Sequence, residues 1–258
     1  MQIVKTNQTE IVKSIKVLYE DEYLAVIEKP SGLVVNVSLS QKNNLTLQNW
    51  LEDINWIGEA NSDSDFAKRC GIVHRLDKET SGVMIIAKKE QAFIELQRQF
   101  KEREIKKTYL TLVYGEIKDL KIGEKLTIDA PIGRNPKNRE RFAVVEDGRA
   151  AITSIKLIEV IAAENGEKFS LLECYPETGR THQIRVHLTA LGYSVIGDQV
   201  YSGRNRIKRN KSNFNRQFLH AAKIAFTHPI TKEKLTVTSD LPDDLLSMIN
   251  FIKKESLS

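Results

Sequence analysis

The chain has 258 residues, of which 41% are hydrophobic and 28% charged, a composition of ordinary globular proteins that argues against fibrous and low-complexity classes. No apolar run approaches the ~20 residues of a membrane-spanning helix, and no charged-then-apolar leader opens the chain. We therefore expect a cytoplasmic protein whose two cysteines, Cys70 and Cys174, are reduced thiols. The net charge of +5 permits a nucleic-acid partner without requiring one.

The first half of the chain alternates strand and helix patterns. Residues 1–15 are predicted to be a loose N-terminal arm, which leaves one domain over residues 16–258. A strand pair is expected over residues 15–35, around the acidic turn Glu20–Glu22. The elements expected next are a helix over 43–57, a loop over 58–68, a buried strand over 83–87, a helix over 90–105 and a strand over 108–117.

The second half is predicted to consist mainly of hairpins. In order, we expect a basic hairpin or loop over 131–145, strands over 149–161 and 168–179 around Asn165–Gly166, a short helix over 184–191, a basic loop over 204–216, a hairpin over 221–238, and a helix from Pro242. In that last helix the inward residues are Leu245, Met248, Ile249 and Ile252. Antiparallel hairpins with interspersed helices indicate an α+β fold.

The segment HRLDKETSG, His74–Gly82, concentrates charged residues just before the apolar strand. Arg75 and Lys78 favour the anionic form of the Asp77 carboxylate, which could act in a sheltered site as a nucleophile or a base. Ser81 and Gly82 are read as a turn at the edge of the strand. The alternative is a solvated turn with surface ion pairs that contribute little.

A second concentration, ETGRTHQIRVH, covers residues 177–187. His182 and His187 invite a metal interpretation, but on a helix they diverge by about 140°, and no cysteine or carboxylate completes a ligand set. We therefore predict no metal. Arg180 and Arg185 fit recognition of a carboxylate or phosphate better, although structural ion pairs would use the same residues. Tyr109 opens the strand KKTYLTLVYG, where it is a packing residue or a stacking platform for a base.

These segments, in this order and spacing, resemble the RluA-type family of RNA pseudouridine synthases. The matching pieces are DEYLAVIEKPSGLVV, HRLDKETSG, KKTYLTLVYG, PIGRNPKNRERFAV, TGRTHQIRVHLTALGYSVIGDQVY and RQFLHAAKIAFTHP. They extend over roughly residues 17–240, nearly the whole chain. The most specific combination is HRLDKETSG followed about a hundred residues later by TGRTHQIRVH.

The resemblance implies an enzyme that converts uridine in a folded rRNA or tRNA into pseudouridine, without metal or cofactor. It implies that Asp77 is the essential carboxylate, that Arg185 pairs with it, and that Tyr109 stacks on the target uracil. Arg75 would fill the gap left by the flipped nucleotide, whose unstacking costs a few kcal/mol. The other expected substrate-binding residues are His74, Arg180, Arg134 and Arg141, with phosphate contacts from residues 131–141 and 204–216.

The resemblance also implies an architecture, a mixed and mostly antiparallel central sheet in two halves, with Asp77 on the floor of a cleft between them. Many relatives begin with a small RNA-binding module, and the arm before Ile15 is too short for one. We therefore expect target choice to rest on the catalytic domain and its loops. Since the sequence has no obvious spare apolar helix, we expect a monomer. Two alternatives remain: a nucleoside hydrolase, which would release free uracil, and a non-catalytic RNA-binding protein.

Overall fold

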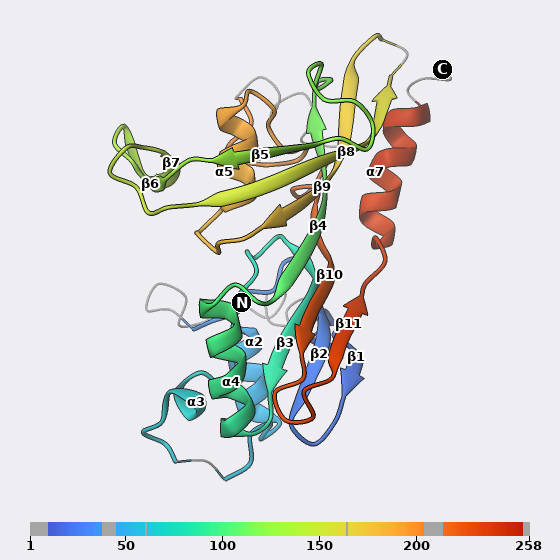
Figure 1. Cartoon of the computed structure of the whole chain (residues 1–258). Helices are drawn as coiled ribbons and strands as arrows, with labels where there is room; N and C mark the ends of the chain where they lie inside the picture. The colour runs from blue at the N-terminus through green and yellow to red at the C-terminus, as the bar shows by residue number, and fades with distance from the viewer. Residues whose placement is uncertain (1–9, 38–44, 60, 164, 204–213, 255–258) are drawn as a thin grey trace. The chain divides into compact units, whose positions relative to one another are not determined.

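The computed structural model of the chain describes residues 10–37, 45–59, 61–163, 165–203 and 214–254. These residues fall into two compact units (Figure 1). The first unit comprises Met1–Lys106 and Lys223–Ser239, and the second comprises Lys107–Ala222 and Asp240–Ser258. The chain therefore leaves the first unit after Lys106, returns to it at Lys223 and leaves it again after Ser239, and each unit is described separately below.

The first unit is built on antiparallel strands covered by short helices. Its strands are β1 (Lys16–Glu20), β2 (Leu24–Lys29), β3 (Ser81–Ala87), β11 (Lys234–Thr238) and the end of β10 (Leu219–Thr227). Its helices are α2 (Leu47–Asp53), α3 (Asp65–Lys68) and α4 (Glu90–Lys101). β2 pairs with both β1 and β3, and the end of β10 pairs with β11. Every residue of β3 is buried, so this strand lies at the centre of the unit's core.

Several predicted assignments in the first unit were wrong, and the predicted helix over 90–105 ends at Lys101. Ser81 and Gly82 belong to β3 rather than to a turn, because Gly82 is already paired with Lys29 of β2. The predicted helix over 43–57 is shorter, since Thr46 caps α2 by accepting a hydrogen bond from the amide of Asn49. The predicted loop over 58–68 contains α3, which Phe66 anchors by packing its ring against Phe93.

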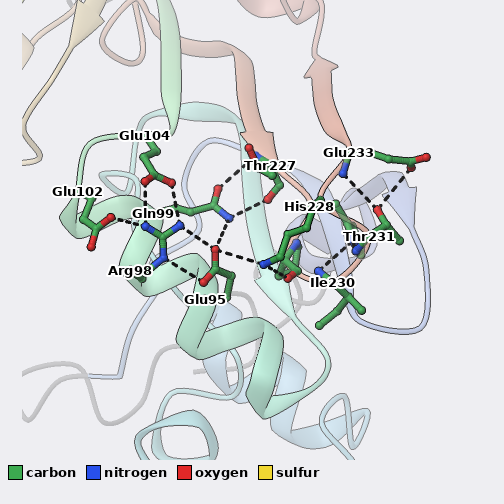
Figure 2. A network of polar contacts seen from close by, with 12 residues as sticks. Glu95, Arg98, Gln99, Glu102, Glu104, Thr227, His228, Ile230, Thr231 and Glu233 are labelled. Atoms are coloured by element: carbon green, nitrogen blue, oxygen red, sulfur yellow. Dashed lines mark hydrogen bonds and ion pairs between the residues drawn. The ribbon is translucent and has the colours of Figure 1, made fainter.

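A network of polar contacts ties α4 to the β10–β11 turn (Figure 2). The fully buried amide of Gln99 donates to the carbonyl of Thr227 at 2.8 Å and accepts from its backbone N–H at 3.2 Å. Next along the chain, Nδ1 of His228 accepts from the amides of Ile230 and Thr231, while its Nε2 contacts Asp21 at 2.8 Å. These side-chain hydrogen bonds hold the end of β10 and the turn that follows it.

The second unit contains a larger antiparallel sheet. Its strands are β4 (Lys106–Tyr114), β5 (Lys125–Asp129), β8 (Ile152–Ala162) and β9 (Lys168–Pro176), in the order β4-β9-β8-β5, with β6 (Ile132–Asn135) and β7 (Asn138–Val144) forming a separate hairpin. Helix α5 (Gln183–Ala190) contacts β7, β8 and β9, and α7 (Asp243–Lys254) packs on β8. This agrees with the predicted order of hairpins and helices. In α7 the predicted inward residues Leu245, Met248 and Ile252 are buried, and Ile249 packs beside them.

The remaining predictions on organisation are tested only in part. Residues 10–13 form one helical turn in which Val12 is buried, and the boundary of the arm at residue 15 stays a prediction. Residues 204–213 of the predicted basic loop lie outside the described residues. Arg216, at its end, forms an ion pair with Asp244. Among the described helices, none has the length and apolarity needed to cross a lipid bilayer.

Candidate active site

Asp77 lies in an irregular segment that leads into β3. The neighbouring Leu76 is buried, Arg75 is exposed, and Asp77 itself is half-buried. A turn follows at once, because the amide of Thr80 donates to the carbonyl of Asp77 at 3.1 Å. Leu76 therefore anchors the segment in the core while the adjacent carboxylate keeps some access to solvent.

The Lys29–Gly32 segment at the end of β2 holds the residues just after Asp77. The ammonium of Lys29 is fully buried and donates to the carbonyls of Pro30, Leu33 and Lys78, at 2.7, 2.9 and 3.0 Å. The amide of Gly32 reaches the same Lys78 carbonyl at 2.9 Å. Gly32 has φ +85°, a left-handed conformation that favours glycine. The sequence analysis missed this role of Lys29, for which the only signal was a lysine at the end of the mostly apolar strand LAVIEK.

His74 holds the Asp77 segment on the N-terminal side of Asp77. Its Nε2 accepts a hydrogen bond from the amide of Ile85 in β3, at 3.0 Å, and its ring packs on Phe100 with centroids 4.7 Å apart. These contacts make His74 part of the support of the Asp77 segment. Its predicted contact with RNA, like that of Arg75, stays a prediction.

In the second unit, Arg185 projects from α5 and is buried with a carboxylate that the sequence analysis did not identify. Its Nε and one terminal nitrogen donate to Asp198 at 2.7 and 3.0 Å, and the two side chains are 4% and 0% exposed. Oδ1 of Asp198 also accepts from the amides of Val200 and Tyr201. The preceding Gly197 is required, because a Cβ there would lie 1.9 Å from the carbonyl oxygen of Arg216. The buried pair therefore fixes the orientation of the Arg185 guanidinium.

Tyr109 is half-buried on β4, where it packs against the core of the second unit and pairs in register with Cys174. Lys107 lies two residues earlier and so on the same face of the strand. Burial lowers the pKa of Lys107 from 10.5 to about 8. This part of β4 thus presents an aromatic ring and an amine to the same side.

The remaining predicted arginines also lie in the second unit. Arg180 is half-buried and donates to the carbonyl of Ala150 at 3.0 Å. Arg134 and Arg141 are exposed on the β6–β7 hairpin, where the guanidinium of Arg134 lies 4.5 Å from the ring centre of Phe142. The structure therefore brings Arg134, Arg141 and Arg185 into one unit, whereas Asp77 belongs to the other with His74 and Arg75.

The two histidines that suggested a metal have other contacts. His182 meets the hydroxyl of Tyr201 at 2.9 Å, and the buried His187 meets Thr153 and the carbonyl of Ala130 at 3.0 and 2.9 Å. Burial lowers the pKa of His187. Within the described ranges no group of three or more histidine, cysteine or acidic side chains is arranged to hold a metal ion. Both cysteines are buried free thiols.

Comparison with known proteins identifies the family. The family model described as RNA pseudouridylate synthase matches residues 23–190. The chain belongs to this family. Ribosomal large subunit pseudouridine synthase D of Nitrosomonas europaea is 38% identical over 253 residues, which make up 96% of this chain and 68% of that protein. An uncharacterized RNA pseudouridine synthase of Chloroflexus aurantiacus is 47% identical over 177 residues, or 69% of this chain and 52% of that protein.

The solved structures agree with this result. Human RNA pseudouridylate synthase domain containing 1 superposes with a TM-score of 0.67 at 28% identity, covering 90% of this chain and 85% of that chain. The predicted fold class is confirmed as α+β, with a mixed, mostly antiparallel sheet and flanking helices. This enzyme is an RNA pseudouridine synthase, an isomerase that acts on RNA, so the hydrolase and non-catalytic alternatives are set aside. The cleft with Asp77 at its floor stays a prediction.

Proposed function

We propose that the enzyme isomerises specific uridines in structured large-subunit rRNA. The observation that carries this proposal is the similarity to proteins named ribosomal large subunit pseudouridine synthase D, at 38% and 36% identity over 96% and 99% of this chain. The second candidate substrate from the sequence, tRNA, has no comparable support among these relatives. The basic net charge of +5 is suited to either RNA.

In this proposal Asp77 is the catalytic carboxylate. As an anion it attacks C1′ of the target ribose or removes the C2′ proton, and either step frees the uracil to turn over and rejoin through C5. Support comes from the way its segment is held, by Leu76 in the core, by His74 on β3 and by Lys29 on the next carbonyl. A reacting group must be held to within a fraction of an ångström, and these contacts restrict the backbone on both sides of Asp77.

Arg185 and Tyr109 complete the proposed catalytic set. A guanidinium has five N–H donors in a planar fork, so one arginine can bond two carboxylates, and Asp198 is one of them here. We assign Asp77 as that second carboxylate. Tyr109 stacks on the target uracil and takes part in the final proton transfer at C5, a role suited to a half-buried ring with a polar tip.

RNA is bound by exposed arginines in both units. Arg75 fills the stack that the flipped nucleotide leaves, and Arg134 and Arg141 contact phosphates from the β6–β7 hairpin, aided by His74 and Arg180. The hairpin supports this assignment because Arg134, Lys137, Arg139 and Arg141 are all exposed on it. Phosphate contacts of this kind place the substrate without reading its sequence.

The test is pseudouridine mapping on unmodified large-subunit rRNA and tRNA transcripts, each incubated with the unaltered enzyme, with Asp77→Asn or with Asp63→Asn. Asp63 is an exposed residue of the same unit and serves as the matched control. We expect rRNA sites that appear with the unaltered enzyme and the control but not with Asp77→Asn. Modification of tRNA alone would overturn the rRNA substrate, and an active Asp77→Asn variant would overturn the role of Asp77.

A further inference from the structure

Tyr201 lies in the turn after Asp198 and contacts three parts of the second unit. Its hydroxyl accepts the backbone N–H of Phe142 in β7 at 3.1 Å and meets Nδ1 of His182 at 2.9 Å. The guanidinium of Arg185 lies over its ring, 5.0 Å from the centroid. Its own amide donates to Asp198 at 2.9 Å. One side chain therefore links the hairpin, the start of α5 and the buried Arg185–Asp198 pair.

The hydroxyl of Tyr201 makes two hydrogen bonds. Its oxygen accepts the N–H of Phe142, and the second bond joins it to Nδ1 of His182, whose tautomer sets which group donates. Phenylalanine at this position would leave the Phe142 amide and the His182 nitrogen without these bonds, while keeping the ring against Arg185. The hydroxyl and the ring thus have separable roles.

His182 adopts a left-handed conformation, with φ +57°, immediately before α5. Such a conformation is unfavourable for a residue with a Cβ, and it persists where the surroundings impose it. Here the ring lies between two aromatic neighbours, edge-on to Phe142 and to Tyr201 with centroids 5.9 and 5.6 Å away. The strained residue therefore packs against Phe142 and Tyr201, which the Tyr201 hydroxyl links to each other through the backbone N–H of Phe142.

On the β6–β7 hairpin, this set of contacts ends at the protein surface. Phe142 is half-buried, and the exposed Arg134 lies over its ring at 4.5 Å. β7 lies against α5, the helix that carries Arg185 (Figure 1). A continuous set of contacts consequently runs from Arg134 through Phe142, His182 and Tyr201 to Arg185.

We propose that Tyr201 and His182 are positioning residues that couple the β6–β7 hairpin to Arg185, the Tyr201 hydroxyl holding the hairpin and its ring holding the guanidinium. This rests on the proposed roles of the hairpin in RNA binding and of Arg185 in catalysis. Loss of the hydroxyl should then weaken RNA binding, whereas loss of the ring should slow turnover. RNA bound to the hairpin would in turn stabilise the working orientation of Arg185.

The experiment compares Tyr201→Phe, Tyr201→Leu and His182→Asn, with Tyr175→Phe as the control. Tyr175 is another half-buried tyrosine of the second unit, and its hydroxyl donates to Glu173 outside this set of contacts. Asparagine is chosen for His182 because it tolerates the left-handed conformation while removing the ring. Two quantities are measured: hydrogen exchange of β6–β7 peptides in the RNA-free enzyme, and kcat and KM for pseudouridine formation.

For Tyr201→Phe and His182→Asn we expect hairpin exchange about tenfold faster than in the control, since a hydrogen bond at the Phe142 amide or its support is lost. KM should rise severalfold while kcat of Tyr201→Phe stays within about twofold. Tyr201→Leu should add a loss of about tenfold or more in kcat, because the flat surface under Arg185 is gone.

Unchanged hairpin exchange and KM in Tyr201→Phe would overturn the proposal, as would a kcat in Tyr201→Leu equal to that of Tyr201→Phe. If Tyr201→Leu does not fold, the hydrogen-exchange rates of Tyr201→Phe and His182→Asn decide whether the proposal stands. Hydrogen exchange needs no substrate, so an enzyme inactive on rRNA would count against the proposed function and leave the coupling to be decided by exchange alone.

Discussion

The ammonium group of Lys29 donates a hydrogen bond of 3.0 Å to the carbonyl oxygen of Lys78, the residue that follows Asp77. The two residues are 49 positions apart in sequence. Burying an ammonium group is costly unless its protons are bonded, and here the carbonyls of Pro30 and Leu33 accept as well. The end of β2 therefore determines where the segment with the proposed catalytic carboxylate lies.

Replacing Lys29 with methionine should destabilise the enzyme and slow it. Methionine keeps most of the volume but removes the ammonium donor from three carbonyls, of which that of Lys78 keeps the Gly32 amide, so we expect a loss of about 2–4 kcal/mol in the free energy of unfolding. Turnover should fall because the Asp77 segment loses an anchor. Urea unfolding and pseudouridine formation measure the two effects. The control, Lys16→Met on the exposed face of β1, should change stability by less than about 0.5 kcal/mol, and equal behaviour of both variants would contradict the assigned role.

Removing Arg185 should cost stability through Asp198. Arg185→Ala leaves a buried carboxylate that keeps its two backbone N–H bonds but loses its cation, an expected destabilisation of about 3–5 kcal/mol. Arg185→Lys retains the charge but cannot form the bidentate bond. Its free energy of unfolding should therefore lie between those of the unaltered enzyme and Arg185→Ala. A double-mutant cycle with Asp198→Asn, followed by thermal unfolding, measures the coupling of the pair. Additive effects of the two substitutions would show that the pair contributes no specific stabilisation.

Asp21 should make stability depend on acid pH. Burial alone would raise its pKa, but hydrogen bonds from Tyr19, Leu24, Tyr23 and His228 outweigh it, and the pKa is lowered from 3.8. Because the folded-state pKa is the lower one, the unfolded chain binds the proton first on acidification. The contribution of Asp21 is complete above its unfolded pKa and is lost as the pH falls through the folded one.

The stability difference between the unaltered enzyme and Asp21→Asn should therefore be constant at neutral pH and shrink from about pH 4 downward. Denaturant unfolding at a series of pH values measures it. An exposed carboxylate, Asp53, supplies the control through Asp53→Asn, whose difference should stay flat. A stability difference between the unaltered enzyme and Asp21→Asn that grows as the pH falls would have the opposite sign and would contradict the lowered pKa of Asp21.

Gln99 should be needed for the end of β10 to stay attached to α4. Gln99→Leu removes both bonds to the backbone of the half-buried Thr227 (Figure 2), an expected loss of about 1–3 kcal/mol in the free energy of unfolding. Gln97→Leu, on the same helix and only half-buried, is the control. Hydrogen exchange at Thr227 should rise with the first substitution and not with the second. Equal exchange in both would show that β10 does not depend on this side chain.

Local patterns in the sequence predicted most elements of the fold. Apolar spacing placed α4, α7 and the β8–β9 hairpin, because helices and half-buried strands impose their own periods on the chain. The errors fell at boundaries such as Ser81–Gly82, where pairing with Lys29 on another strand decides the conformation. A strand edge depends on its partner, and the partner is not visible in a local window.

By itself, the sequence determined the family, the order of the elements and the candidate residues Asp77, Tyr109 and Arg185, since these lie in compact motifs whose spacing survives in the linear chain. Only the tertiary structure decided that Asp198 is the buried partner of Arg185 and that Tyr201 joins His182 to the hairpin. Ion pairs and hydrogen bonds between side chains have no sequence period. Their partners are chosen by the turns and strand registers that bring distant segments together, so they become visible only in the folded chain.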